Sequence, residues 1–235
     1  MPNSGSGRSS TFGAIQRNTL KDQCYAELRR ALISGRFEPG ENVTVKLLAE
    51  QLQSGTMPVR EAVQRLVAEG AFLNLPNGRI CVPDLSRQEF EDIVEMRLLL
   101  EPYSCRKAAE SDPGTLVEDL ARLQRQLKAA FREGGAEDTL WANHQFHFRI
   151  YGHASSRLMF NTIESIWLRF GPIMTHTLKK KVRGATAYVR AELKLHETLC
   201  NALANGNGKG AQEAMGEIIQ GTANWYLNEY PFNPG

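Results

Sequence analysis

The sequence predicts a mainly α-helical protein, with a small N-terminal domain of helices and a β-hairpin followed by an all-α bundle of six or seven helices. Apolar residues recur at helical spacing in most segments between residues 20 and 227. Two short β-type runs occur together only once, around Asn77-Gly78. From Ser86 onward, helix caps and helix stops alternate nearly to the end, without an internal repeat or a heptad run.

Composition limits the class of protein. The chain has 235 residues, 42% of them hydrophobic and 23% charged, as in a globular protein of one or two domains. No apolar run reaches the roughly 18 residues of a membrane span, and the N-terminus lacks the apolar core of a secretory signal. The four cysteines show no CxxC spacing, which favours reduced thiols and a cytoplasmic location. Residues 1–14 are rich in Ser and Gly and are expected to be disordered.

The first helix is expected over Leu20–Ser34, with Gly35 as its C-cap. Thr44 is a plausible N-cap for a second, short helix carrying Leu47, Leu48 and Leu52.

The third helix lies within Ser54–Gly70. One face is apolar, and the opposite face carries short polar side chains and a basic one. The apolar residues are Val59, Ala62, Val63, Leu66 and Val67, and those opposite are Thr56, Met57, Arg60 and Gln64. This is the layout of a recognition helix, which docks on its own domain through the apolar face and enters a DNA groove with the other.

A hairpin is expected next, because Ala71–Leu75 and Arg79–Pro83 flank Pro76-Asn77-Gly78. Three helices and a hairpin make a winged helix-turn-helix domain, placed at residues 15–83, whose wing carries Asn77, Gly78 and Arg79 at its tip. Residues 1–83 hold ten basic and seven acidic residues, a net +3, whereas the remainder nets −1. The asymmetry weakly favours a polyanion as partner of the N-terminal part.

Residues 84–228 are expected to form the helical bundle. Ser86-Arg-Gln-Glu89 is a capping box that opens its first helix. The later helices begin at Asp112-Pro113, Glu137, Ser155, Tyr188 and Gly210, and the one from Ser155 is expected to end at Gly171-Pro172. Residues 229–235 form a tail.

These residues resemble a known family. The pattern LRRALISGRFEPGENVTVKLLAEQL, then PVREAVQRLVAEG and NGRICV, resembles the winged helix-turn-helix of GntR regulators. EMRLLLEPYSCRKAA, Asn143–His147 and Leu195-His196-Glu197 resemble the FCD effector domain of the FadR subfamily. The resemblance covers about residues 15–228. It implies a dimeric transcriptional regulator, more often a repressor, that binds a palindromic double-stranded DNA operator and responds to a small effector, commonly an organic acid.

The resemblance also implies DNA-binding residues. Arg60, in Pro-Val-Arg, is the strongest candidate, since arginine reads guanine or grips phosphate bidentately. The others are Lys46, Thr56, Met57, Gln64, Arg29 and Arg30 as phosphate clamps, Arg65, and Gly78 with Arg79 in the wing. The alternative for Arg60 is a surface ion pair with Glu61 or Glu50. Where the family has Ser-Arg-Thr, this chain has Gly55-Thr56-Met57, which predicts an unusual operator sequence.

The FCD metal site, an Asp and three His in the family, falls here on Asn143, His147, His196 and Ile218. Two strong ligands are too few for zinc, nickel or manganese, so a divalent metal is the less favoured reading of this degraded site. The favoured alternative is a metal-free cavity in which Arg97, Asn143, His147 and His196 bind the effector directly, with Arg97 suited to a carboxylate. In the plainest alternative, Arg97 pairs internally with Glu101.

Two other functions remain open from the sequence. A small metal-dependent enzyme on the bundle would use the histidines, but no carboxylate pair, HExxH or Cys–His arrangement supports it. A winged-helix module that only mediates protein assembly is disfavoured by the spread of Arg and Lys over the N-terminal domain.

Overall fold

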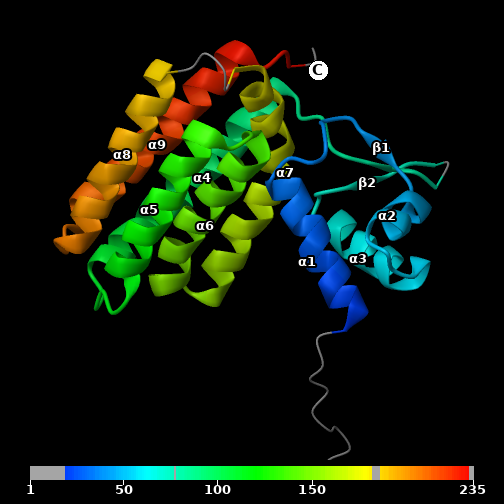
Figure 1. Cartoon of the computed structure of the whole chain (residues 1–235), viewed down its shortest axis with the longest axis horizontal. Coiled ribbons are helices and arrows are strands. Elements are labelled where there is room, and N and C mark those ends of the chain that lie inside the picture. The colour runs from blue at the N-terminus through cyan, green and yellow to red at the C-terminus, as the bar shows by residue number, and fades with distance from the viewer. Residues whose placement is uncertain (1–18, 77, 182–185, 233–235) are drawn as a thin grey trace, which may run out of the picture.

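The computed structural model describes residues 19–76, 78–181 and 186–232, and it contains two adjoining parts (Figure 1). The expectations for residues 1–14, for Asn77 and for the last three residues of the tail lie outside these ranges. The N-terminal part, here called the head, contains α1 (Leu20–Ile33), β1 (Asn42–Val43), α2 (Val45–Gln51), α3 (Thr56–Ala68), β2 (Leu73–Asn74) and β3 (Ile80–Cys81). The bundle contains α4 (Arg87–Ala109), α5 (Leu116–Glu133), α6 (Ala136–Ala154), α7 (Arg157–Lys181), α8 (Thr186–Ala204) and α9 (Gly208–Glu229).

The head has the fold of a winged helix-turn-helix, as the sequence predicted. The Thr44 hydroxyl accepts a hydrogen bond from the Leu47 amide and so caps α2. β2 and β3 form the expected antiparallel hairpin, and Gly78 at its end has a φ of +74°, which glycine adopts without strain. The sheet also contains β1, which the sequence did not predict, in the order β1-β3-β2. A strand of two residues is too short to show a period.

The bundle surrounds a separate hydrophobic core. Its first helix begins at the predicted capping box, in which Ser86 accepts from the Glu89 amide and Glu89 accepts from the Ser86 amide. Phe90, Tyr151 and Tyr226 are among its largest fully buried side chains. No helix in the part of the chain that the structure describes is both long and apolar enough to cross a bilayer.

One predicted helix end is wrong. The sequence suggested a stop at Gly171-Pro172, but α7 continues through both residues to Lys181. Proline removes one backbone donor, yet Ile173 and Met174 beyond it are buried in the bundle core. Tertiary packing on the far side of the proline therefore overrides the local preference to end the helix.

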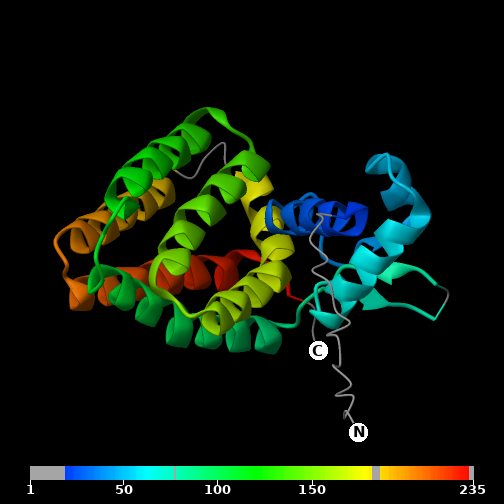
Figure 2. The same ribbon diagram turned by 90° about the horizontal axis from the view of Figure 1, so that it is seen from below.

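The head packs on the bundle through α1, one end of which meets α7 (Figure 2). Leu168 of α7 is buried in the head's core, and Trp141 of α6 packs against it. Gly171 allows the close approach, because a Cβ there would lie 2.5 Å from the carbonyl oxygen of Leu32. The two parts thus share an interface built from side chains of both.

Candidate DNA interface and effector cavity

The outward face of α3 carries the four residues expected on it. Thr56, Met57, Arg60 and Gln64 are all exposed, Met57 by 63%, while the apolar face is buried in the head. Gly55 is the N-cap residue of α3 and provides no side-chain cap. Among the described residues no ion pair or hydrogen bond involves Arg60. Glu61, one of its expected partners, instead pairs with Lys21 at 3.4 Å, so the Arg60 guanidinium is available to contact DNA.

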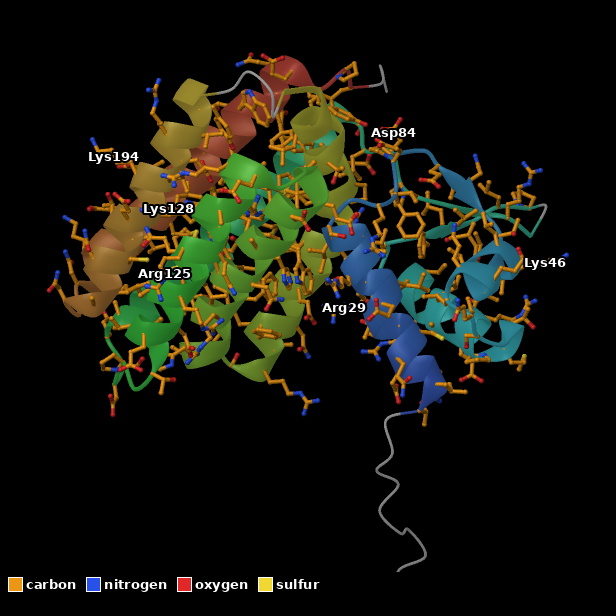
Figure 3. All side chains as sticks on the ribbon, in the orientation of Figure 1. Arg29, Lys46, Asp84, Arg125, Lys128 and Lys194 are labelled. Carbon is orange, nitrogen blue, oxygen red and sulfur yellow. The ribbon has the colours of Figure 1, made fainter. Side chains whose placement is uncertain are left out.

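Lys46 and the wing add to this exposed surface. Lys46 projects from α2 at the outer end of the head (Figure 3). Gly78 and Arg79 are exposed at the end of the hairpin, and nothing lies within 4 Å of a Cβ placed on Gly78. A nucleic-acid backbone could therefore approach the wing closely.

Three other expected DNA contacts have different surroundings. Arg29 forms an ion pair with Glu164 of α7, and Figure 3 places it between α1 and the bundle. The guanidinium of Arg30 stands 4.8 Å from the ring centroid of Trp141. Arg65 lies 3.7 Å from the Tyr25 ring centroid and pairs with Glu69. In this arrangement Arg29 and Arg30 hold α1 against the bundle, which the sequence alone could not indicate because their partners are more than a hundred residues away.

The bundle encloses a small cavity among α4, α5, α6, α7, α8 and α9. Three of the four expected effector residues, Arg97, Asn143 and His147, line it, as does Ile218. Its free volume is about 30 Å³, room for about one or two water molecules. The remaining lining residues are Phe131, Thr139, Leu140, Met174, Leu178, Tyr188, Glu192, Thr222 and Tyr226. An effector of more than a few atoms needs some of these side chains to move.

Arg97 and Glu101 form the internal pair that the sequence left as an alternative. Arg97 Nε donates to Glu101 Oε1 at 2.7 Å, and both side chains are buried. Glu101 also accepts from the Tyr151 hydroxyl at 2.5 Å and from Trp167 Nε1 at 2.9 Å. The carboxylate is fully engaged, whereas Arg97 still has N–H groups that Glu101 does not use.

His147 and His196 touch directly, with their Nε2 atoms 3.2 Å apart. His196 Nδ1 lies 2.8 Å from the carbonyl oxygen of Glu192 and must donate to it, so His196 Nε2 accepts and His147 Nε2 donates. Burial lowers the pKa of His196 to about 4, and burial together with His196 lowers the pKa of His147 well below its usual value. Both imidazoles are therefore neutral at pH 7.

The donor set does not fit a divalent metal. Beside the two histidines stand a neutral amide, Asn143, and an apolar side chain, Ile218, while zinc requires about four strong ligands. Within the described ranges, no group of three or more His, Cys, Asp or Glu side chains is arranged to hold a metal ion. The hydrogen bond between the two histidines satisfies the nitrogens that would otherwise face a metal.

Glu192 is a cavity residue that the sequence reasoning missed. Its side chain is 9% exposed, and Glu192 Oε1 lies 3.9 Å from Nδ1 of the neutral His196. Burial raises the pKa of Glu192 to about 7, an effect that Arg97 partly opposes. The sequence did contain a clue, since Glu192 precedes His196 by four residues and so shares its face of α8.

Comparison with known proteins identifies both parts. The family model described as bacterial regulatory proteins, gntR family, matches residues 20–82. The model of the FCD domain matches residues 92–221. The regulator McbR of Escherichia coli is 28% identical over 208 residues, covering 88% of this chain and 93% of McbR. The solved McbR structure superposes with a TM-score of 0.81 at 27% identity, over 90% of this chain and 99% of that one.

Other relatives are regulators too. The repressor GlaR of E. coli is 34% identical over 67% of this chain and 78% of its own length. The gluconate operon repressor of Bacillus subtilis is 25% identical over 61% of this chain and 60% of its own length. The family and these relatives are transcriptional regulators rather than enzymes, which removes the metalloenzyme alternative. This chain therefore belongs to the GntR family of bacterial transcriptional regulators, in the FadR-like group that carries a C-terminal FCD domain.

Proposed function

We propose that this protein is a ligand-responsive repressor that binds a palindromic operator as a homodimer and changes its affinity when a small organic acid enters the bundle. It acts on genomic DNA in the cytoplasm, with residues 15–83 as DNA-binding domain and residues 84–228 as effector domain. The observation that carries the proposal is the combination of an exposed α3 face, on which Arg60 has no partner among the described residues, with a small cavity in the FCD domain that Arg97, His147 and Glu192 help to line.

On the DNA side, Arg60 contacts a base edge or phosphate, with Gln64, Thr56 and Met57 beside it and Lys46 and the Gly78–Arg79 wing on the flanks. Met57 stands where a polar or basic residue would read other bases, and its apolar side chain suits a thymine methyl. Arg65 remains a weaker candidate. Arg29 and Arg30 reach phosphate only if their contacts with the bundle open.

The cavity residues define the class of effector. Arg97, with N–H groups left over, suits a carboxylate, while Glu192 offers hydrogen-bond acceptors and the neutral His147 lines the same cavity. An organic acid that also carries a hydroxyl or amino group can bind Arg97 through its carboxylate and Glu192 through that second group, without a metal. The gluconate repressor is named for an operon concerned with such a hydroxy acid.

The DNA assignment is tested by footprinting on genomic fragments. The Arg60→Ala variant should lose operator protection, a loss of about 1–3 kcal/mol per half-site contact. Arg122→Ala, a change at another exposed arginine, on α5, is the control and should protect like the wild type. Intact protection by Arg60→Ala would refute the assignment.

The effector assignment is tested by thermal shift against hydroxy and amino acids. A ligand at 100 times its dissociation constant stabilises the fold by about 2.7 kcal/mol. Arg97→Met and Glu192→Gln should each abolish the shift for a ligand that uses both ends. Metal analysis of protein purified without chelator checks the metal-free assignment, which near-stoichiometric zinc, nickel or manganese would overturn.

A further inference from the structure

A hollow of about 290 Å³ opens where the head meets the bundle. Glu69, the C-cap residue of α3, lines it from the head, and α4 and α7, which lie side by side (Figure 2), line it from the bundle. The bundle cavity holds only about 30 Å³, so the hollow is much the larger of the two and reaches the size of a small-molecule site. The lining residues from the bundle are Glu89, Asp92, Ile93, Met96, Thr162, Ser165, Ile166 and Arg169.

Arg169 is the one basic residue that lines the hollow, and its hydrogen-bonding groups are unused. Among the described residues, no hydrogen bond or ion pair involves the Arg169 guanidinium, and its Nε atom is buried without a partner. A Cβ placed on Gly70 would lie 3.6 Å from this Nε, so the side chain lies against the end of α3. Burying a polar group without a partner costs free energy, and a carboxylate can accept two hydrogen bonds from one guanidinium. Arg169 is therefore suited to bind a carboxylate.

The three acidic residues of the hollow already have hydrogen-bond partners. Both carboxylate oxygens of Glu69 accept from the Tyr25 hydroxyl, at 2.7 and 2.8 Å, and Glu89 belongs to the capping box of α4. Asp92 Oδ1 accepts from the side-chain amide of Gln88 at 2.9 Å, which leaves Oδ2 for another donor. Three carboxylates and one guanidinium give the hollow a negative charge. A simple anion would be repelled there, whereas a ligand that carries both charges would not.

The hollow also has an apolar part. Met96 follows Asp92 by four residues on α4, and Ile166 precedes Arg169 by three residues on α7. Each charged side chain consequently has an apolar neighbour on the same face of its helix. The available guanidinium, the available carboxylate oxygen and these apolar side chains thus match three different groups of one small ligand.

We propose that the hollow binds an apolar α-amino acid. The carboxylate of the ligand binds Arg169, its ammonium group binds Asp92, and its side chain packs against Met96 and Ile166. A zwitterion provides a partner for both available groups and adds no net charge to the hollow. This inference goes beyond the proposed function, because the site lies outside the bundle cavity and is shared by the head and the bundle.

Isothermal titration calorimetry of the full-length protein with L-leucine tests the class of ligand. One leucine should bind per chain, and three probes that each lack one part of it should bind at least tenfold more weakly. Isoamylamine lacks the carboxylate, isocaproate lacks the ammonium group, and glycine lacks the apolar side chain. Absence of leucine binding at millimolar concentration would overturn the proposal, as would equally tight binding of any of the three probes.

Two variants test the assigned contacts. Arg169→Gln and Asp92→Asn should each raise the dissociation constant of leucine at least tenfold. The matched controls, at exposed positions outside the hollow, are Arg157→Gln on α7 and Asp138→Asn on α6, and both should bind leucine like the wild type. Far-UV circular dichroism shows whether each variant is folded; Asp92 is exposed, so its variant provides the test even if Arg169→Gln does not fold. Wild-type affinity in a folded Arg169→Gln or Asp92→Asn would contradict the proposed site.

A third variant separates this site from the bundle cavity. Glu192→Gln alters that cavity and should leave the affinity for leucine unchanged. Loss of leucine binding in Glu192→Gln, with wild-type affinity in Arg169→Gln, would place leucine in the bundle cavity. That outcome overturns this inference and leaves the proposed function standing. Leucine binding that depends on Arg169, in a protein without Arg60-dependent operator protection, would do the reverse.

Discussion

At the scale of single residues, burial decides what an ion pair contributes. α4 carries Arg97–Glu101 and Arg106–Glu110, two pairs with the same spacing and similar Nε–O distances of 2.7 and 2.8 Å. The first is buried, and the second is about half exposed. Removing one partner of a buried pair leaves the other charge uncompensated in a low-dielectric interior, whereas water screens the exposed pair.

We therefore predict that Glu101→Gln lowers the free energy of unfolding by about 3–5 kcal/mol. The matched change Glu110→Gln should leave it nearly unchanged. Urea denaturation at neutral pH, analysed with a common m value, measures both. Equal effects of the two variants would show that Arg97 is solvated or compensated by another group.

A second residue-scale prediction concerns Glu192 and pH. Because burial raises its pKa from 4.5 to about 7, the folded state holds its proton where the unfolded state has released it. The folded state then binds more protons, so this group makes stability fall as pH rises from about 4.5 to 7, with no further change above. The Glu192→Gln variant has no carboxyl group to ionise, so its free energy of unfolding does not fall in this way. It should be more stable than the wild type by up to about 3 kcal/mol above pH 7, and by much less at pH 5.

The measurement is the difference in unfolding free energy between variant and wild type from pH 5 to pH 8. Glu217→Gln, at an exposed position of α9, is the control and should follow the wild type. A difference that does not change with pH would mean that Glu192 is ionised in the folded state across the whole range.

At the scale of elements, local sequence signals such as N-caps predict most helix starts. Features that depend on tertiary contacts, such as the end of α7, are not predictable from these local signals. Thr44 and Ser86 carry their caps within three residues, so the sequence predicts both. The passage of α7 through Gly171-Pro172, and the placing of Arg29 beside Glu164, depend on packing against segments far away in the chain. Likewise the resemblance to the FCD domain located Asn143 and His147, whereas Glu192 was missed because its burial is set by several helices together.

The contact of α1 with α7 yields an element-scale prediction. A Cβ on Gly171 would lie 2.5 Å from Leu32 O and 2.9 Å from Ile33 Cα, which are backbone atoms that cannot rotate away. Gly171→Ala should therefore lower the melting temperature, although alanine favours helices. Gly221→Ala in α9, where a Cβ meets nothing within 4 Å, should stabilise by about 0.5–1 kcal/mol. Differential scanning calorimetry compares the two; a stabilised Gly171→Ala would refute the tight contact.

At the scale of the whole molecule, the bundle sets the direction in which α3 faces. Arg29–Glu164 and Arg36–Glu137 are ion pairs between head and bundle, and the Arg30 guanidinium lies over Trp141. Two recognition helices of a dimer must be spaced by about one turn of DNA, roughly 34 Å. A head that is held rigidly on its bundle can bind only operators with one half-site spacing. A head with a loosened attachment can bind operators with several spacings.

Glu164→Lys, which places two positive charges together at this junction, should consequently relax the spacing requirement. Each added base pair moves a half-site by about 3.4 Å and turns it around the helix. The gel shifts use the operator found by footprinting and versions of it whose half-site spacing is one base pair longer or shorter. The wild type should bind only the natural spacing. The variant should bind it more weakly and the altered spacings almost equally well. Glu213→Lys on α9 is the control for added charge and should behave as the wild type. Undiminished discrimination by Glu164→Lys would mean that the other contacts along α1 suffice to orient the head.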